Sequence, residues 1–196
     1  LMALSRAARA FSNRRYLMEA EELAGFMAAS LHENGALMAR LCGGELKYAA
    51  QLDDYAFYAL GLLELYYADF DPAHILKAEE LAENIRERFA DEEGGYFRTA
   101  IDAEKLIIRP KEIFDGAMPS GNSAAAVLFD RLFRLMGKEA WRAASEDQRN
   151  FISRSAGQYP AGCCYALTAM LTDGTSRELV CVTPDAVSYT HLRAHE

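Results

Sequence analysis

The residues best suited to chemistry lie in one stretch, Ile108 to Ala126, which reads IRPKEIFDGAMPSGNSAAA. It begins with basic residues around a proline and ends in small polar residues that lead into an apolar, alanine-rich segment. Guanidinium and ammonium groups bind carboxylates and phosphates, while hydroxyl and amide groups hydrogen-bond to sugar hydroxyls. The stretch is therefore typical of a cavity lining. Its candidate ligand-binding residues are Arg109, Lys111, Ser120 and Asn122.

The same stretch has an ordinary structural interpretation. Serine and asparagine commonly cap the helix that follows them, and Ser120 and Asn122 stand where a cap is needed. Arg109 and Lys111 can equally be exposed loop charges. The residue types alone leave both interpretations open.

The composition excludes some classes of partner. The chain has 196 residues, 51% of them apolar, and a formal net charge of -8. Nucleic acids and anionic membranes select for an excess of Lys and Arg, so we expect neither as a partner. No apolar run approaches the roughly 18 residues that a membrane span requires, and Glu64 interrupts the best candidate.

The cysteines and the first residues suggest the setting of the protein. The spacing of Cys42, Cys163, Cys164 and Cys181 fits no zinc motif, so we expect buried structural thiols, no metal, no cofactor and a cytoplasmic location. The chain begins at Leu1, already inside a helical pattern, so we expect the natural N-terminus to lie upstream.

Hydrophobic periodicity predicts a mainly helical chain. Helices that are apolar on nearly every face alternate with helices that have one polar face, which indicates inner and outer positions. The inner helices are expected near residues 1–11, 53–69, 121–136 and 161–171, and the outer helices near 16–31, 71–89 and 139–156.

Short strands are expected in the connections between these helices. Leu37–Leu41 and Glu45–Ala49 flank Gly43-Gly44 and predict a β-hairpin. Further strands are expected at Tyr96–Thr99, Leu106–Arg109 and Arg177–Thr183.

The alternation of buried helix, outer helix and long loop repeats about three times. Two concentric shells of helices explain this pattern. We therefore predict an all-α fold, a partial α/α toroid of about three helical hairpins with short β-hairpins in its loops. The N–H groups at the starts of the inner helices would face a central cavity.

Three blocks of sequence carry a family resemblance. LDDYAFYALGLLELY, FADEEGGYF and IRPKEIFDGAMPSGNSAAA occur in that order. They resemble the C-terminal half of the spermatogenesis-associated, thioredoxin-domain-containing family, which includes bacterial YyaL-like proteins. The resemblance covers roughly residues 1–171 and implies a six-hairpin glycosidase-like toroid.

The resemblance also implies a division of the chain. Residues 1–186 would be the C-terminal half of a toroid, with a thioredoxin-like domain and further hairpins preceding it. Residues 187–196, VSYTHLRAHE, fit no helix of the pattern and are interpreted as a foreign or disordered tail. Fold does not fix function, so the reaction stays open.

A glycosidase-like toroid suggests a specific pair of catalytic groups. Glycoside hydrolysis requires two carboxyl groups on either side of one bond, one of them protonated. Asp54 and Asp115 are the candidates for acid and base, because each is expected near the start of an inner helix. Asp53, Tyr55, Glu93 and Tyr96 complete the candidate binding set, although Asp53 is also predicted to cap its helix.

The sequence therefore supports two functions. The first is a carbohydrate-active-like toroid whose cavity binds a sugar or sugar-like small molecule and which, if it is an enzyme, processes glycosides. The alternative is a non-catalytic scaffold or protein-interaction toroid attached to a thioredoxin-like domain.

Overall fold

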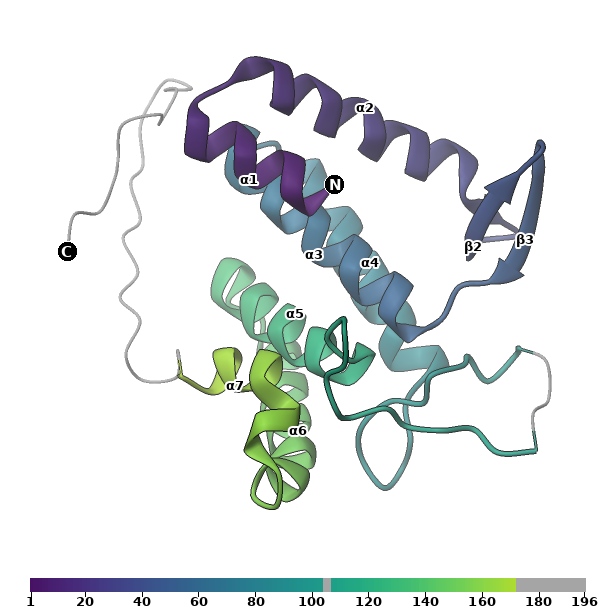
Figure 1. Cartoon of the computed structure of the whole chain (residues 1–196), viewed down its shortest axis with the longest axis vertical. Coiled ribbons are helices and arrows are strands. Elements are labelled where there is room, and N and C mark those ends of the chain that lie inside the picture. The colour runs from purple at the N-terminus through teal and green to yellow at the C-terminus, as the bar shows by residue number, and fades with distance from the viewer. Residues whose placement is uncertain (104–106, 172–196) are drawn as a thin grey trace.

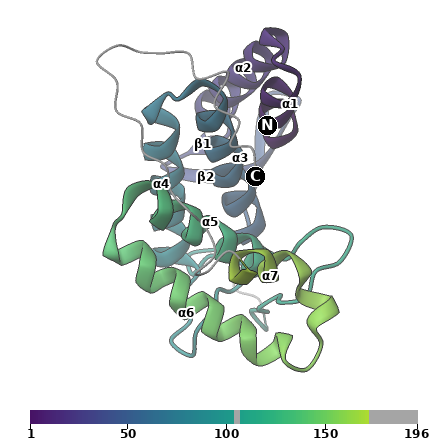
Figure 2. The same ribbon diagram turned by 90° about the vertical axis from the view of Figure 1, so that its left-hand side faces the viewer.

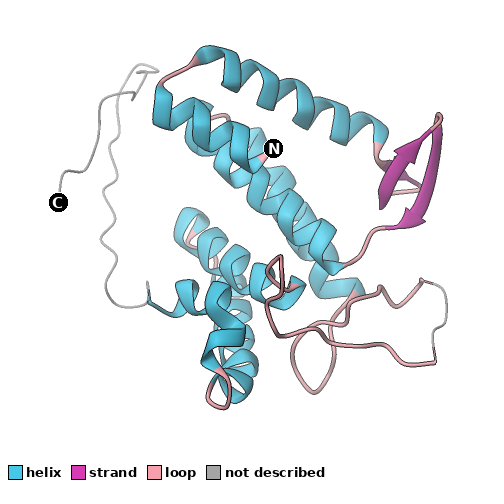
Figure 3. Cartoon of the chain, in the orientation of Figure 1, coloured by secondary structure: helices cyan, strands magenta, loops and turns pink. Residues whose placement is uncertain are grey.

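The computed structural model describes residues 1–103 and 107–171. The predicted tail at 187–196, the predicted strand at 177–183, Leu106 and Cys181 lie outside this part of the chain. Figure 3 shows that helices dominate and that the named strands lie together at one end of the molecule.

The helices form two sets, as the alternation predicted. The inner set comprises α1 (Met2–Phe11), α3 (Leu52–Asp69), α5 (Gly121–Met136) and α7 (Cys164–Leu171). The outer set comprises α2 (Arg14–Ser30), α4 (Pro72–Arg88) and α6 (Glu139–Ala156). A short 3₁₀ helix, η1 (Pro160–Cys163), leads into α7.

The packing of these helices produces an arc of hairpins. Successive inner helices contact each other, α1 with α3, α3 with α5, and α5 with α7. Each outer helix packs on the inner helix before it in the chain, which gives three helical hairpins in the described residues. In Figure 1 the inner helices α1, α3, α5 and α7 come in this order from the top of the view downward. Figure 2 shows α5 beside both α4 and α6.

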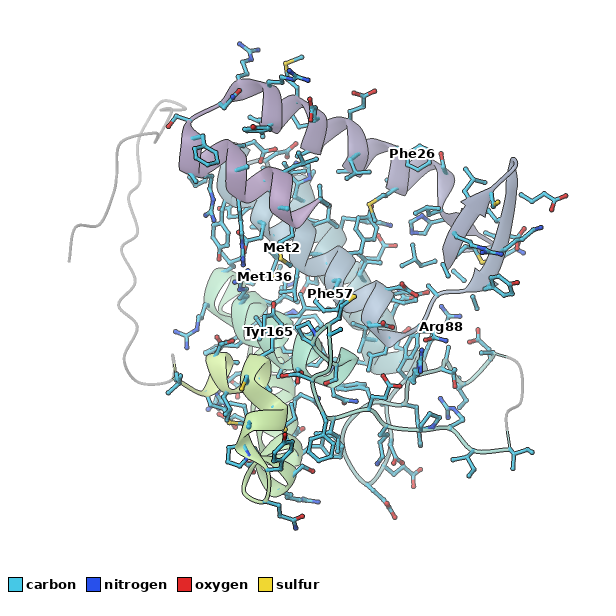
Figure 4. The ribbon with its side chains drawn as sticks, viewed as in Figure 1. Met2, Phe26, Phe57, Arg88, Met136 and Tyr165 are labelled. Atoms are coloured by element: carbon cyan, nitrogen blue, oxygen red, sulfur yellow. The ribbon has the colours of Figure 1, made fainter. Side chains whose placement is uncertain are left out.

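The core reflects this arrangement. α3 is buried along most of its length, with Ala56, Ala59, Leu60 and Leu63 fully covered. Alanines 124 to 126 of α5 are also fully buried, and their small side chains allow neighbouring helices to approach closely. Partly buried side chains from three inner helices, Met2, Phe57 and Tyr165, gather near the centre of Figure 4.

The predicted hairpin in the first inter-hairpin loop is confirmed. β2 (Ala36–Cys42) and β3 (Glu45–Ala49) pair antiparallel across Gly43-Gly44, and a two-residue strand, β1 (His32–Glu33), extends the sheet. Both turn glycines have positive φ, 61° and 81°, a conformation that glycine adopts without steric cost.

The strands expected in the second inter-hairpin loop are not formed in the described residues. Tyr96 makes only an isolated bridge to Ala90, and Arg98 donates its N–H to Pro110 O at 2.8 Å. The prediction was wrong because other groups take the backbone partners that a ladder would need. Asn122 takes both the N–H and the carbonyl of Tyr96, and Leu52 N–H takes the carbonyl of Arg98.

The cysteine prediction is also corrected in part. Cys163 is buried, and burial raises the pKa of its thiol, but Cys42 and Cys164 are exposed. Cys42 ends β2 next to the Gly43-Gly44 turn of the hairpin, and its side chain is exposed there.

No helix within residues 1–103 and 107–171 has both the length and the apolar character needed to cross a membrane.

Two helical glycines give a matched test of the α3–α5 contact. A Cβ at Gly121 would lie 2.8 Å from Leu52 Cγ and 3.1 Å from Asp53 N, whereas nothing lies within 4 Å of a Cβ at Gly25 in α2. We expect Gly121→Ala to lower the free energy of unfolding by about 1–3 kcal/mol, because the start of α5 must move away from α3. Gly25→Ala should raise it by about 0.5–1 kcal/mol. Urea denaturation would measure both, and a stabilised Gly121→Ala protein would contradict the close contact.

Candidate functional site

The candidate site lies where α3 and α5 begin, beside the loop of residues 89–120. Gly121 contacts Leu52 and the backbone of Asp53, so the two inner helices start next to each other. The loop is attached to the same end, because Leu52 N–H donates to Arg98 O at 3.0 Å. The tertiary structure therefore brings together the starts of two helices, Leu52 and Gly121, that are 69 residues apart in sequence.

Asn122 holds the loop to the helices. Its side chain is fully buried, and its amide nitrogen donates to Tyr96 O and Glu112 O, both at 2.8 Å. Its amide oxygen accepts from Tyr96 N at 2.9 Å and from Gln148 Nε2 at 3.0 Å. One side chain thus connects both arms of the loop to α5 and α6, and its hydrogen-bonding capacity is used inside the protein.

Ser120 and Asp115 form a second internal connection. Ser120 Oγ caps α5 by accepting from Ser123 N at 3.1 Å, and it donates to Ile113 O at 3.0 Å. Asp115 accepts from Ser120 N at 2.9 Å with one oxygen and from Tyr165 N at 2.8 Å with the other. Asp115 therefore ties the loop to the start of α5 and to the first turn of α7.

The basic residues of the loop also have internal partners. Arg109 donates to Thr99 O at 2.6 Å, and its guanidinium lies 4.1 Å from the centre of the Phe97 ring. Lys111 forms an ion pair with Asp91 and donates to Gly94 O at 3.1 Å. Neither cation is a freely exposed loop charge.

The two tyrosines are packed into the core. Tyr55 is 2% exposed, and its hydroxyl is hydrogen-bonded to Leu37 N at 3.0 Å and Arg88 Nη1 at 2.6 Å. Tyr96 is 9% exposed and packs edge-to-face on Phe129, and burial raises its pKa to about 12. Flat stacking on a sugar requires an open ring face, which these positions do not offer.

The carboxylates at the start of α3 differ in their contacts. The predicted cap was wrong: α3 begins at Leu52, its N-cap is Gln51, and the carboxylate of Asp54 accepts from Gln51 N at 2.8 Å. Asp53 therefore lies one position inside the helix, and in the described residues no hydrogen bond or ion pair reaches its carboxylate. Glu93, in the loop after α4, is exposed.

The surroundings of Asp54 favour the protonated form of its carboxyl group. Burial is the main cause that raises its pKa above the ordinary value, and the neighbouring charge of Asp53 adds to the increase. The hydrogen bond from Gln51 and the charge of Arg98 oppose it without cancelling it. A partly buried carboxyl group next to a second carboxylate is the arrangement that favours a protonated acid.

Sequence reasoning missed a charged cluster further along the inner helices. Glu64 of α3 has a side chain only 3% exposed, and it accepts from Arg6 at 2.7 Å, Arg9 at 2.9 Å and Arg131 at 2.7 Å. The available signal was a single acidic residue within an apolar helix. Its partners were not identifiable, because they come from α1 and α5. No group of three or more His, Cys, Asp or Glu side chains suited to a metal ion occurs in the part of the chain that the structure describes.

Comparison with known sequences identifies relatives of part of much longer proteins. No protein-family model matches the chain. An uncharacterized protein of Caenorhabditis elegans is 31% identical over 150 residues, which is 72% of this chain and 20% of that protein. Spermatogenesis-associated protein 20 of Homo sapiens is 38% identical over 92 residues, 46% of this chain and 12% of that protein. The chain thus spans about a fifth or less of these relatives.

Comparison with solved structures identifies the fold. Cellobiose 2-epimerase from Spirochaeta thermophila superposes with a TM-score of 0.62 at 19% identity, covering 76% of this chain and 40% of the epimerase. A glycoside hydrolase family 76 mannosidase from Bacteroides thetaiotaomicron superposes with a TM-score of 0.63 at 8% identity, covering 77% and 41%. Both are sugar-processing proteins, and at these identities the likeness concerns the fold alone. The predicted partial α/α toroid is confirmed.

Proposed function

Since the chain is a homologue of part of spermatogenesis-associated protein 20 and has a partial six-hairpin α/α toroid fold, we propose that it contributes to a ring that binds a sugar or sugar-like small molecule. The observation that carries the proposal is the use of this fold by two sugar-processing enzymes, which are 19% and 8% identical to this chain. The bound molecule would lie at the end where α3 and α5 begin.

The carboxylates at the start of α3 are the groups best suited to this ligand. Asp53 has no protein partner in the described residues, so its oxygens can accept hydrogen bonds from sugar hydroxyls. Asp54, whose pKa is raised by burial, is the candidate general acid if the ring is catalytic. Asp115 was the other candidate. With both oxygens held by backbone N–H groups, it is better suited to positioning the loop than to exchanging a proton.

The remaining candidate residues support binding indirectly. Asn122, Ser120, Arg109 and Lys111 fix the shape of the loop through internal contacts, and Glu93 is left exposed. These same contacts support the alternative proposal, a non-catalytic scaffold attached to a thioredoxin-like domain, because a rigid loop with its polar groups satisfied can serve as a supporting surface. Ligand binding distinguishes the two proposals.

The test uses the natural protein that contains this chain, screened against a panel of mono- and disaccharides. If Asp54 is a general acid, Asp54→Asn should lower kcat/KM by about 10²–10⁴-fold. In the wild-type protein, the alkaline limb of the plot of kcat/KM against pH should lie above the ordinary pKa range of carboxyl groups. Asp71→Asn is the matched control, because Asp71 also caps a helix, α4, by accepting from Ala73 N at 2.9 Å.

Three outcomes separate the proposals. Loss of activity in Asp54→Asn, with activity kept in the control Asp71→Asn, supports the catalytic assignment. Sugar binding without turnover supports a ligand-binding ring that is not an enzyme. If no sugar binds to the natural protein, the sugar-binding proposal is wrong and the scaffold proposal is favoured.

A further inference from the structure

Three arginines from two inner helices meet at one carboxylate of a third, and together with Glu64 they are called the arginine cluster below. One oxygen of Glu64 accepts from Arg6 and from Arg131, each at 2.7 Å, so these two guanidiniums lie close together. The other oxygen accepts from Arg9 at 2.9 Å. The Glu64 side chain is 3% exposed, whereas the arginine side chains are 51%, 42% and 26% exposed. The carboxylate is therefore covered, while the guanidiniums remain accessible to a ligand.

The charges of the arginine cluster do not balance. Burial alone would raise the pKa of Glu64, but hydrogen bonds from Arg6 and Arg131 hold it below the ordinary value, so the carboxylate is ionised at neutral pH. Arginine is always charged in proteins. In the described residues the three arginines have no ion pair with any other carboxylate. The cluster therefore has an excess of two positive charges, in a chain whose formal net charge is -8.

Most N–H donors of the arginine cluster have no acceptor in the protein. A guanidinium has five N–H donors in a planar fork. Within residues 1–103 and 107–171, the side chains of Arg6, Arg9 and Arg131 each make one hydrogen bond, in every case to Glu64. The remaining donors are suited to an anion with several oxygens, because such an anion can accept from more than one guanidinium at once.

Two tyrosines lie beside the cluster. The Arg9 guanidinium is 5.3 Å from the centre of the Tyr67 ring. Tyr165 belongs to α7 and lies near the centre of Figure 4. Burial raises the pKa of its phenol, and the nearby charges of Arg131 and Arg6 oppose the increase. A phenol hydroxyl can donate to an anion, so all four inner helices contribute polar groups to this one region.

The cluster is separate from the candidate sugar site. Glu64 lies twelve residues after Leu52 in α3, and Arg131 lies ten residues after Gly121 in α5. With a helical rise of about 1.5 Å per residue, the cluster is roughly 15–18 Å along these helices from the ends where the sugar is proposed to bind. An inference about the cluster therefore does not depend on the sugar-binding proposal.

We propose that the arginine cluster binds the phosphate group of a small phosphorylated molecule. A phosphate monoester carries about -1.5 to -2 charges at pH 7, which matches the excess charge of the cluster. A carboxylate, with one negative charge, would neutralise only half of it. Planar guanidinium forks bind phosphate through paired N–H···O bonds. The overall negative charge of the chain repels a polyanion such as nucleic acid, so the ligand is a small molecule.

Calorimetric titration of the 196-residue chain with glycerol 2-phosphate and with inorganic phosphate tests the proposal, with chloride keeping the ionic strength constant and glycerol as the uncharged probe. Saturable binding of phosphate and none of glycerol is expected, and the tighter of the two phosphates shows whether the ester or the free anion is preferred. Arg6→Gln should weaken binding about ten-fold or more, because it removes a charge-assisted donor. Arg142→Gln is the matched control, because Arg142 is 48% exposed and pairs with Glu139 and Glu146 within α6.

Glu64→Gln should have the opposite effect. Removing the carboxylate removes its repulsion of phosphate, so this variant should bind phosphate about ten-fold more tightly than wild type. Urea denaturation measures the same difference even in a destabilised variant, since a ligand that binds only the folded state raises the urea midpoint. Glycerol 2-phosphate should raise the midpoint most in Glu64→Gln and least in Arg6→Gln.

Two results would overturn the proposal. One is the absence of saturable binding of either phosphate. The other is an equal effect of phosphate on wild type, Arg6→Gln, Arg142→Gln and Glu64→Gln, which would show a general effect of salt.

Discussion

Replacing Asn122 with alanine is expected to lower the free energy of unfolding by about 3–5 kcal/mol and to detach the 89–120 loop from α5. The substitution removes the partner of Tyr96 N, Tyr96 O and Glu112 O, which are held at 2.8–2.9 Å. Gln148 Nε2 loses one of its two acceptors and keeps the backbone oxygen of residue 122. The cost is large because the side chain is fully buried and water cannot replace it.

Urea denaturation of the 196-residue chain measures this loss, and hydrogen exchange of the Tyr96 amide reports on the loop. Asn84→Ala is the matched control, because Asn84 Nδ2 makes a single hydrogen bond to Glu80 O within α4. That control should change the stability by less than about 1 kcal/mol. Asn122→Asp should be as damaging as alanine, because a buried carboxylate would face the carbonyl oxygens of Tyr96 and Glu112. If Asn122→Ala loses less than about 1 kcal/mol, Asn122 does not hold the loop in place.

Glu64→Gln is expected to lower the free energy of unfolding by about 2–4 kcal/mol. Glu64 is the common acceptor of Arg6, Arg9 and Arg131, so it joins α1, α3 and α5 through one carboxylate. A neutral amide would leave three guanidiniums close together with no negative charge between them. The arginine side chains are 51%, 42% and 26% exposed, so water limits the penalty to below that of a fully buried cluster.

The same cluster predicts a dependence on pH. Burial by itself would raise the pKa of Glu64, but hydrogen bonds from Arg6 and Arg131 outweigh it, and the pKa lies below the ordinary value of 4.5. A lowered pKa in the folded state stabilises the fold above the unfolded-state pKa. This contribution is lost as the pH falls below about 4.5 and through the folded-state pKa.

Acid titration monitored by circular dichroism measures this effect. Wild type should lose stability below pH about 4.5 more steeply than Glu64→Gln, which no longer has the titrating group. Glu146→Gln is the surface control, because Glu146 and Arg142 are 47% and 48% exposed and such a pair contributes at most about 1 kcal/mol. Identical acid profiles for wild type and Glu64→Gln would show that the carboxylate does not stabilise the contact between the helices.

The local pattern of the sequence was enough to predict most helices. Gly121–Met136 and Glu139–Ala156 have the predicted bounds, because serine, proline and glycine mark helix ends through local backbone geometry. The alternation of buried and half-buried helices also predicted the two shells, because the distribution of apolar residues around a helix indicates how many of its faces are covered. The N-cap of α3 was misplaced by two residues, because Gln51 and Asp54 cap the helix together and Asp53 was the stronger local signal.

The candidate site was predicted only as a region. Gly121, which begins the inner helix α5, lies beside Leu52 and the backbone of Asp53, so the two predicted segments start next to each other. The roles of individual residues depended on partners at distant positions. The Asn122 side chain is hydrogen-bonded to Glu112 and Gln148, which are 10 and 26 residues away in sequence. The Asp115 carboxylate accepts a hydrogen bond from Tyr165, 50 residues away.

The sequence by itself thus determined the fold class, the alternation of helices and the residues that gather at one end of the arc. Each of these follows from short-range periodicity and capping, which act within a few residues. Only the tertiary structure decided which polar groups are already satisfied and which remain available to a ligand. Hydrogen bonds such as those of Asn122, Asp115 and Glu64 form between elements that packing brings together, and no local pattern encodes their partners.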